Sequence, residues 1–308
     1  MKKLYFTWNI KEKPEDFVVE EIAKHQIDNS GEHFLYILEK KNFTTRELAN
    51  LYNFSYAGLK DKVGITRQYV SFDRFVGDTF EYIRKDRFYR FSFVGRTRKK
   101  IKLGRLLGNR FWIKLNLRDI ILTDWFINYY DTQRIKNNYQ RGKKLIEDIK
   151  NKNKTRKKLS WTENFLIDAY LSYLWNKSVE LFLKERFKGI YVQEDDVLFF
   201  LPLIEYHTVK ESVPRYWTIL GYKVDLGKTK KYYTQVLKDE GFVLEDFIDL
   251  LNRLKIKGDY RKTFIKVDEI CIDDRYIQFE LPKGSYATMF LKHLYLNTYA
   301  KKNKSDKI

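Results

Sequence analysis

Cysteine is almost absent from this sequence. The 308 residues include one, Cys271, so no intrachain disulfide can form and a cysteine-anchored zinc site is excluded. Four histidines are scattered without metal-ligand spacing, and each is interpreted as an ordinary surface or core residue: His25, His33, His207 and His293. The sequence therefore predicts no metal site.

Long apolar runs are also missing. None reaches the roughly 18 residues of a membrane span, and the first residues lack the apolar segment and small-residue cleavage site of a signal peptide. We expect a soluble, cytoplasmic protein without a membrane partner. There is no P-loop, no G-x-G-x-x-G and no internal repeat, so the common nucleotide-binding and solenoid classes receive no support.

Glycine and proline are few, whereas aromatic residues and positive charge are plentiful. The chain has 14 Gly and 4 Pro against 23 Phe, 23 Tyr and 6 Trp, which favours a folded protein. Its formal charge of +19 favours a polyanionic partner, since neutralised phosphates release counterions. A lysine-rich proteome is the alternative, and runs such as residues 151–154, NKNK, fit it. Charge and aromatics together favour nucleic acid.

Alternating apolar residues predict strands in the first part of the chain. A capping box at residues 44–47, TTRE, predicts a short helix that ends near Asn53. Strict alternation after residue 110 predicts a strand with one buried face, formed by Phe111, Ile113, Leu115 and Leu117. The other strands are expected at residues 4–8, 17–22, 34–38 and 69–72 and, as a pair, within 80–93.

Helical spacing replaces alternation in the middle of the chain. A helical segment is expected after Arg134 through about Lys150, and a second capping box at residues 160–163, SWTE, starts a helix that ends near Phe187. Short strands and loops are expected at residues 190–228. The later elements are two short helices within 231–256 broken at Gly241, strands at 264–267 and 276–281, and a final helix capped by Ser285 that ends near Tyr299.

Aromatic strands thus resume only after the helical middle. This order predicts a discontinuous domain in which the first strands and the last strand pair share one sheet. We place this domain at residues 1–125 and 267–308, with residues 126–266 inserted between its two parts.

A charged loop between two short apolar runs is the first candidate for chemistry. It lies within residues 54–72, FSYAGLKDKVGITRQYVSF, and holds Asp61 between Lys60 and Lys62. A carboxylate flanked by cations stays ionised at neutral pH, and loops carried by rigid strands often hold catalytic residues. Taken alone, however, such an Asp is more often an ordinary surface turn residue.

Five stretches in order resemble the TruD family of tRNA pseudouridine synthases. Residues 11–21 are similar to the family's K-x-x-P-E-D-F-x-V-x-E, and residues 57–68 to A-G-x-K-D-[KR]…T-x-Q. Residues 103–111, LGRLLGNRF, resemble L-G-x-L-x-G-N-x-F. Residues 128–134, NYYDTQR, resemble N-Y-F-G-x-Q-R, with Asp131 in place of Gly. Residues 281–288, LPKGSYAT, resemble L-P-x-G-S-[YF]-A-T.

The resemblance implies a fold and a reaction. The expected fold class is α+β: a mixed, mainly antiparallel-sheet pseudouridine synthase catalytic domain with an inserted α/β TRUD-type domain. The expected activity is isomerisation of a uridine in tRNA, at position 13 in the D arm for the family, to pseudouridine. No metal or organic cofactor and no obligatory protein partner are expected; the partner is tRNA.

The resemblance also implies site residues. Asp61 would be the catalytic carboxylate, and Lys11 would pair with it and keep it charged. Phe111 would stack on the flipped uracil, although its alternation with Ile113 equally fits a plain core strand. Asn109 would read the uracil edge, with a turn residue as the alternative.

Other charged and polar residues receive roles around this site. Lys60 and Lys62 are then interpreted as supporting or RNA-facing charges. Ser285 to Thr288 either shape the same cleft or form a plain helix cap. The basic runs at residues 96–100 and 150–158 are candidate phosphate contacts, with a solvated face as the alternative.

Two readings from other classes remain open. A non-catalytic RNA-binding or RNA-folding module would share the fold and the basic charge. A DNA-binding protein is the third reading, but no helix-turn-helix or zinc pattern supports it.

Overall fold

The structure is a computed structural model that describes residues 3–7, 9–115, 120–151, 159–273 and 275–305. Leu117 and most of the basic run at 150–158 lie outside the described residues. Two compact units make up the chain: a sheet unit of residues 8–118 and 267–285, and a helical unit of residues 1–7, 119–266 and 286–308. These limits differ from the predicted division at both chain ends. The assignment of a catalytic and an inserted domain stays a prediction.

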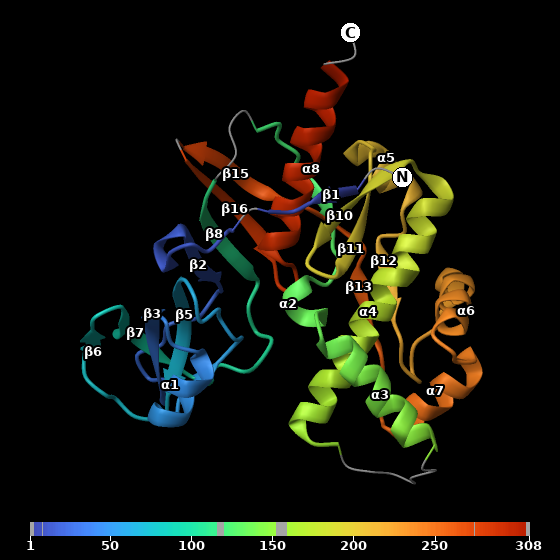
Figure 1. The fold of residues 1–308 in the computed structure, drawn as a ribbon. Helices are drawn as coiled ribbons and strands as arrows, with labels where there is room; N and C mark the ends of the chain where they lie inside the picture. The colour runs from blue at the N-terminus through green and yellow to red at the C-terminus, as the bar shows by residue number, and fades with distance from the viewer. Residues whose placement is uncertain (1–2, 8, 116–119, 152–158, 274, 306–308) are drawn as a thin grey trace. The chain divides into compact units, whose positions relative to one another are not determined.

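The sheet unit is built mainly from β-strands, as Figure 1 shows. Its helical elements are a 3₁₀ turn, Pro14–Asp16, and α1, Thr45–Tyr52. Its strands are β2 (Phe17–Ile22), β3 (His33–Lys41), β4 (Ser55–Tyr56), β5 (Ile65–Phe72), β6 (Thr79–Arg84), β7 (Arg87–Thr97), β8 (Gly108–Lys114), β15 (Asp268–Asp273) and β16 (Tyr276–Pro282).

These strands form one sheet in the order β15-β16-β8-β2-β5-β3-β7-β6, with β4 paired to β5. Only β2 and β5 pair in parallel, and the other described pairs are antiparallel. β16 lies beside β8 in a register that sets Phe279 opposite Phe111. The α+β, mainly antiparallel fold class is confirmed, and β16 joins the first strands as predicted. The other strand of the predicted last pair does not, because residues 264–266 form β14 (Phe264–Lys266), which pairs with β9 (Trp125–Ile127) in a separate two-stranded sheet, and β15 lies beside β16 instead.

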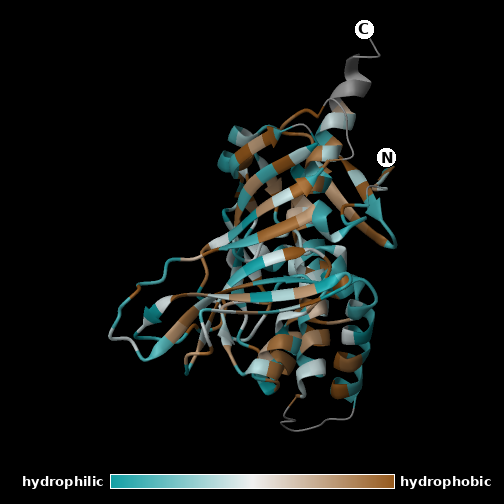
Figure 2. Ribbon diagram, turned by 90° about the vertical axis from the view of Figure 1, so that its left-hand side faces the viewer, coloured by the Kyte–Doolittle hydropathy of each residue, from teal (hydrophilic) through white to brown (hydrophobic). Residues whose placement is uncertain are grey.

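An aromatic core lies between α1 and the sheet. The capping box at the start of α1 is present, since Thr44 Oγ1 accepts from the Glu47 amide at 3.0 Å and Glu47 Oε2 accepts from the Thr44 amide at 2.8 Å. Leu48 of α1 is buried against the sheet. Alternation along most of the strands gives them an apolar face, visible as bands in Figure 2. The buried aromatic side chains of this core are Tyr36, Phe54, Phe72, Tyr89 and Phe91.

The helical unit carries the longest helix, α4, Trp161–Arg186. Its other helices are α2 (Thr132–Ile135), α3 (Asn138–Asn151), α5 (Tyr206–Ser212), α6 (Lys230–Asp239), α7 (Leu244–Arg253) and α8 (Ala287–Ser305), with a 3₁₀ turn at Gly227–Thr229. Its strands are β1 (Lys3–Tyr5), β9 (Trp125–Ile127), β10 (Gly189–Glu194), β11 (Val197–Pro202), β12 (Tyr216–Ile219), β13 (Asp259–Lys262) and β14 (Phe264–Lys266).

α4 is the packing centre of the helical unit. It contacts α3 and α6 (Figure 1) and two strands, β11 and β12. The predicted capping box holds its first turn, with Ser160 Oγ accepting from the Glu163 amide at 3.2 Å. Buried side chains occur all around the helix rather than on one stripe, among them Leu166, Tyr170 and Trp175. A helix covered on every side is expected to be apolar all round.

Asp131, which stands where the resembled motif has Gly, has a structural role. Its carboxylate caps α2, accepting from the Thr132 amide at 2.8 Å, and also accepts hydrogen bonds from Thr288 and Lys292. Lys292 is fully buried and pairs with Glu194 as well. Removing Asp131 would withdraw one of the two carboxylates that neutralise this buried ammonium group.

Three expectations about the elements are corrected. β1 pairs in parallel with β10 in a separate three-stranded sheet, so it does not extend the large sheet. Residues 190–228 contain the helix α5 besides strands and loops. Ser285 does not cap the final helix, because α8 begins at Ala287 and the Ser285 hydroxyl makes no hydrogen bond within the described residues.

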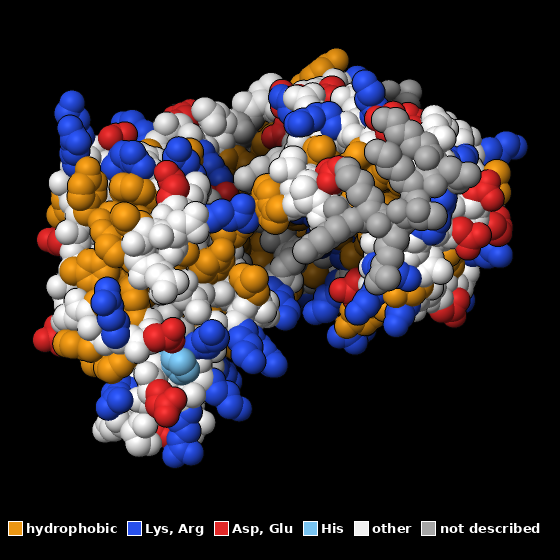
Figure 3. All heavy atoms as spheres, turned by 90° about the horizontal axis from the view of Figure 1, so that it is seen from below, with side chains coloured by type: hydrophobic (Ala, Val, Ile, Leu, Met, Phe, Trp, Pro, Cys, Tyr) orange, Lys and Arg blue, Asp and Glu red, His pale blue; other side chains and the backbone are white. Residues whose placement is uncertain are grey.

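The positively charged surface side chains are spread widely over the face seen in Figure 3.

No helix of the described residues is long and apolar enough to cross a membrane.

Candidate active site

The loop that carries Asp61 comprises residues 57–64, between β4 and β5, and we call it the acidic loop. Buried polar groups from three elements fix it. Lys40 Nζ of β3 donates to the Asp61 carbonyl at 2.7 Å. The Lys60 amide donates to Thr45 Oγ1 of α1 at 3.1 Å. Gln68 of β5 accepts from the same Thr45 hydroxyl at 2.7 Å and donates to the Gly58 carbonyl at 3.2 Å. The loop backbone is therefore held rigidly.

A glycine at the end of the loop permits a close approach to β2. Gly64 has a φ of +141°, in a region that side chains disfavour, and a Cβ at this position would lie 2.7 Å from the Phe17 carbonyl oxygen. This contact allows β5 to start directly beside β2, with which it pairs in parallel.

The Asp61 side chain pairs with Lys11. The two lie 3.3 Å apart, Nζ to Oδ2, with 23% and 29% of their side chains exposed. The Lys11 ammonium also lies 3.9 Å from the centre of the Phe17 ring, where a cation–π contact helps to hold it. The ion pair expected from sequence is thus present, and it leaves the carboxylate accessible from solvent.

Lys60 points away from Asp61 and into the protein. Its ammonium group lies 2.9 Å from Glu21 Oε2 and 2.6 Å from Asn109 Oδ1, and 4% of its side chain is exposed. Burial raises the pKa of Glu21, while the charge of Lys60 opposes that shift. The supporting role expected for Lys60 fits this position, but the RNA-facing alternative is wrong, because the side chain is buried.

Asn109 lies in β8 rather than in a turn. An ammonium group can only donate hydrogen bonds, so the amide oxygen of Asn109 must face Lys60. The NH₂ group of the amide is then directed away from Lys60. This orientation makes Asn109 a hydrogen-bond donor toward any ligand that reaches it.

Phe111 is part of the buried face of the sheet. Its ring stacks on Phe279 at a centroid distance of 5.3 Å and meets Phe17 edge-on at 6.1 Å. With 6% of its surface exposed, it has the neighbours of a core strand residue. Phe17 connects it to Lys11 and hence to the Asp61 pair. Stacking of Phe111 on a base stays a prediction.

Sequence reasoning did not single out Lys40, Thr45 or Glu21 as site residues. A signal for Lys40 existed, because Tyr36, Leu38 and Lys40 occupy alternate positions of one strand and all three are fully buried. A buried lysine on an apolar face needs a hydrogen-bond acceptor for its ammonium group. For Lys40 this acceptor is the Asp61 carbonyl in the acidic loop.

Burial lowers the pKa of Lys40 to about 8, with the nearby Asp61 charge opposing the shift. We expect the ¹³C resonance of its ε-carbon to titrate near pH 8, below the ordinary lysine value of about 10.4. Between these two pH values the unfolded chain binds more protons than the folded one, so this residue's contribution to stability rises with pH. Disappearance of the signal in Lys40→Arg assigns it, and titration at the ordinary value would contradict the prediction.

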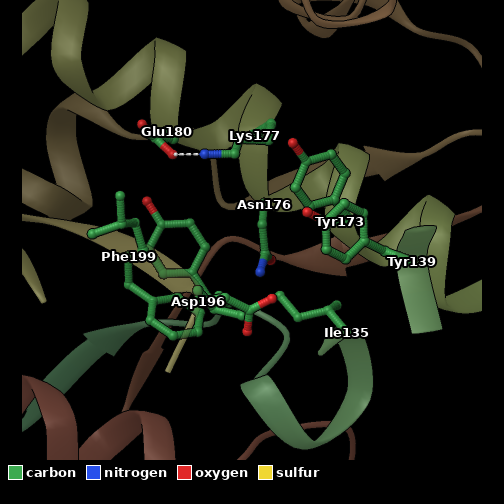
Figure 4. Close-up of a pocket in the computed structure, with 11 residues that line it drawn as sticks. Ile135, Tyr139, Tyr173, Asn176, Lys177, Glu180, Asp196 and Phe199 are labelled. Atoms are coloured by element: carbon green, nitrogen blue, oxygen red, sulfur yellow. Dashed lines mark hydrogen bonds and ion pairs between the residues drawn. The ribbon is translucent and has the colours of Figure 1, made fainter. Parts of the chain in front are cut away.

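A hollow of about 190 Å³ lies in the helical unit (Figure 4). The rings of Tyr139 and Tyr173 stack in it at 4.2 Å, and Lys177 pairs with Glu180 at 3.0 Å. Asn176 uses both ends of its amide on the backbone of Tyr130. Lys177, Glu180 and Asn176 thus already have partners within the described residues. The described residues contain no cluster of His, Cys, Asp and Glu that would hold a metal ion.

Comparison with known proteins agrees with this fold. The model of the family described as tRNA pseudouridine synthase D (TruD) matches residues 6–135 and 133–294. The chain therefore belongs to the TruD family.

Several relatives match over nearly their whole length. The chain is 27% identical to "Probable tRNA pseudouridine synthase D" of Nanoarchaeum equitans, with 93% of this chain and 98% of the relative covered. It is 28% identical to tRNA pseudouridine synthase D of Wolinella succinogenes, with 96% and 98% covered. A crystal structure from Methanosarcina mazei that carries the TruD name has the same fold, with a TM-score of 0.56, 19% identity and 92% of each chain covered.

Proposed function

We propose that this protein is a tRNA pseudouridine synthase that converts uridine 13 of the D arm to pseudouridine, with Asp61 as the catalytic carboxylate. The proposal rests on family membership and on one observation: a solvent-accessible aspartate, ion-paired to Lys11, on a loop fixed by buried hydrogen bonds. A carboxylate held in this way is oriented before the substrate binds.

The reaction is an isomerisation that needs no external reactant. The N1–C1′ bond breaks, the uracil turns, and a C5–C1′ bond forms; C5 loses a proton and N1 gains one. A carboxylate oxygen of Asp61 suits three alternative roles in this reaction: addition to the base, attack on C1′, or removal of the proton from C5. The uridine must first leave the RNA stack, at a cost of a few kcal/mol.

Asn109 and Phe111 are assigned to the extruded base. Asn109 has its amide oxygen engaged by Lys60, so its NH₂ group would donate to a uracil carbonyl. Phe111 would contact the face of the base after a local rearrangement, since its ring now stacks on Phe279. Lys11 would hold the Asp61 carboxylate in position through their ion pair.

The test is incubation of the protein with a full set of unmodified tRNAs, followed by mapping of pseudouridine. We expect a new pseudouridine at position 13 without any added cofactor. Product at another position would overturn the site specificity alone. Tight tRNA binding without product at any position would instead favour a non-catalytic RNA-binding module.

A further inference from the structure

A groove of about 700 Å³ with a basic lining lies in the sheet unit, next to the first residue of the acidic loop, Ala57. It is formed by the segment after β2 and by the segment that follows β7. We call it the basic groove, and its lining residues are Lys24, His25, Gln26, Asp28, Thr97, Arg98, Lys99, Lys100, Ile101, Lys102 and Arg105.

Most cations of the basic groove lack a carboxylate partner. Lys and Arg are common over the surface, as the face in Figure 3 shows, so positive charge alone marks no site. Asp28 is the acidic residue in the lining, and Arg98 already pairs with it. Within the part of the chain that the structure describes, no ion pair is formed by the others, Lys24, Lys99, Lys100, Lys102 and Arg105. Such crowding of like charges is relieved by a bound polyanion.

The basic groove is joined directly to the acidic loop. The Gly104 amide donates to the Ala57 carbonyl at 2.7 Å, and the Ile101 amide donates to Ser71 Oγ at 2.9 Å. Ile101 is buried in a small cluster with Ala57. Because residue 57 begins the loop that carries Asp61, a ligand held in the groove lies on the same rigid framework as that carboxylate.

The lining chemistry suits phosphates rather than bases. No Phe, Tyr or Trp lines the groove, and the imidazole of His25, the aromatic ring in its lining, already meets the Tyr69 ring edge-on at a centroid distance of 4.7 Å. Lysine ammonium groups bind phosphate as point charges, and Arg105 adds a planar donor fork. Contacts of this kind fix the position of a nucleic acid without reading its sequence.

We propose that the basic groove binds the sugar-phosphate backbone of the substrate RNA close to the target uridine. This inference rests on the proposed function and deepens it by assigning the contact that holds the RNA while the base is extruded. The groove contributes affinity that depends on salt and not on base sequence.

The test compares two double variants that remove one Lys and one Arg each. Lys100→Gln with Arg105→Gln alters the groove. Arg84→Gln with Lys85→Asn alters the β6–β7 hairpin, at the other end of β7, which is 11 residues or roughly 35 Å long. Asn is chosen at position 85 because Lys85 has a φ of +52°. Binding of unmodified tRNA is measured over a series of salt concentrations.

We expect the slope of log affinity against log salt to fall by about 1.4–1.8 in the groove variant, which loses two phosphate contacts, and to stay unchanged in the hairpin variant. An equal change in both variants, or none in either, would overturn the groove. A change of slope with duplex DNA but not with tRNA would show that tRNA does not use the groove and would also overturn it. If the two variants change the slope as expected but the wild-type protein forms no pseudouridine, the groove is supported and the proposed reaction is wrong.

Discussion

Replacing Asp61 by Asn is expected to lower pseudouridine formation by more than about 10³-fold while tRNA affinity changes by less than about twofold. Asn keeps the size of the side chain and removes its charge. The loop backbone is held by Lys40, Thr45 and Gln68, none of which contacts the Asp61 carboxylate in the hydrogen bonds described above, so the loop should keep its conformation.

The loss follows from the chemistry of the isomerisation. An amide oxygen is a weak nucleophile and a weak base, so Asn supports none of the three alternative roles open to a carboxylate. Binding should persist because phosphate contacts supply most of the affinity for nucleic acid, and Asp61 carries a negative charge that contributes no such contact.

Single-turnover assays with unmodified tRNA and direct binding measurements separate the two effects. Asp73→Asn is the matched control, since Asp73 follows the far end of β5 and is mostly exposed. We expect full activity from the control. Turnover by Asp61→Asn at a rate within about tenfold of wild type would remove Asp61 from its catalytic role.

Local patterns in the sequence were sufficient for most of the sheet unit. Alternation located β2, β3, β5 and β8, because each strand has one buried face. Both capping boxes marked the first residues of their helices, since the pairing of side chain and backbone is local.

Pairing between distant segments was harder to predict. β1 joins β10 in the helical unit, and nothing in a three-residue strand specifies which edge it will extend. Ser285 has the residue type of a helix cap, but α8 starts two residues later. In both cases the outcome depends on tertiary contacts that local preference does not encode.

The charges of the acidic loop show the same limit. In sequence, Lys60 and Lys62 flank Asp61 and look like its partners. In the structure the partner is Lys11, because neighbouring residues in a loop need not face the same side. Lys60 instead pairs with Glu21, a residue of the first motif. Only the resemblance to a family, which aligns several motifs at once, pointed to Lys11.

Replacing Lys60 by Met is expected to lower the free energy of unfolding by about 3–5 kcal/mol. The Glu21 side chain is fully buried and lies 2.9 Å from the Lys60 ammonium, so the variant leaves a carboxyl group in the interior without its charged partner. Urea unfolding measures the change. Arg90→Met is the control, because it breaks the exposed Arg90–Glu81 pair and should cost less than about 1 kcal/mol.

The double variant Glu21→Leu with Lys60→Met separates stability from positioning. Removing both buried charges should restore most of the lost stability, since no unpaired charge remains. Turnover should nevertheless stay lower than wild type by on the order of 10²-fold, because the Asn109 amide has lost the ammonium group that orients it. A double variant that regained both stability and full turnover would show that the pair only supports the fold. Recovered stability with low turnover would mean that Lys60 acts on the base through Asn109.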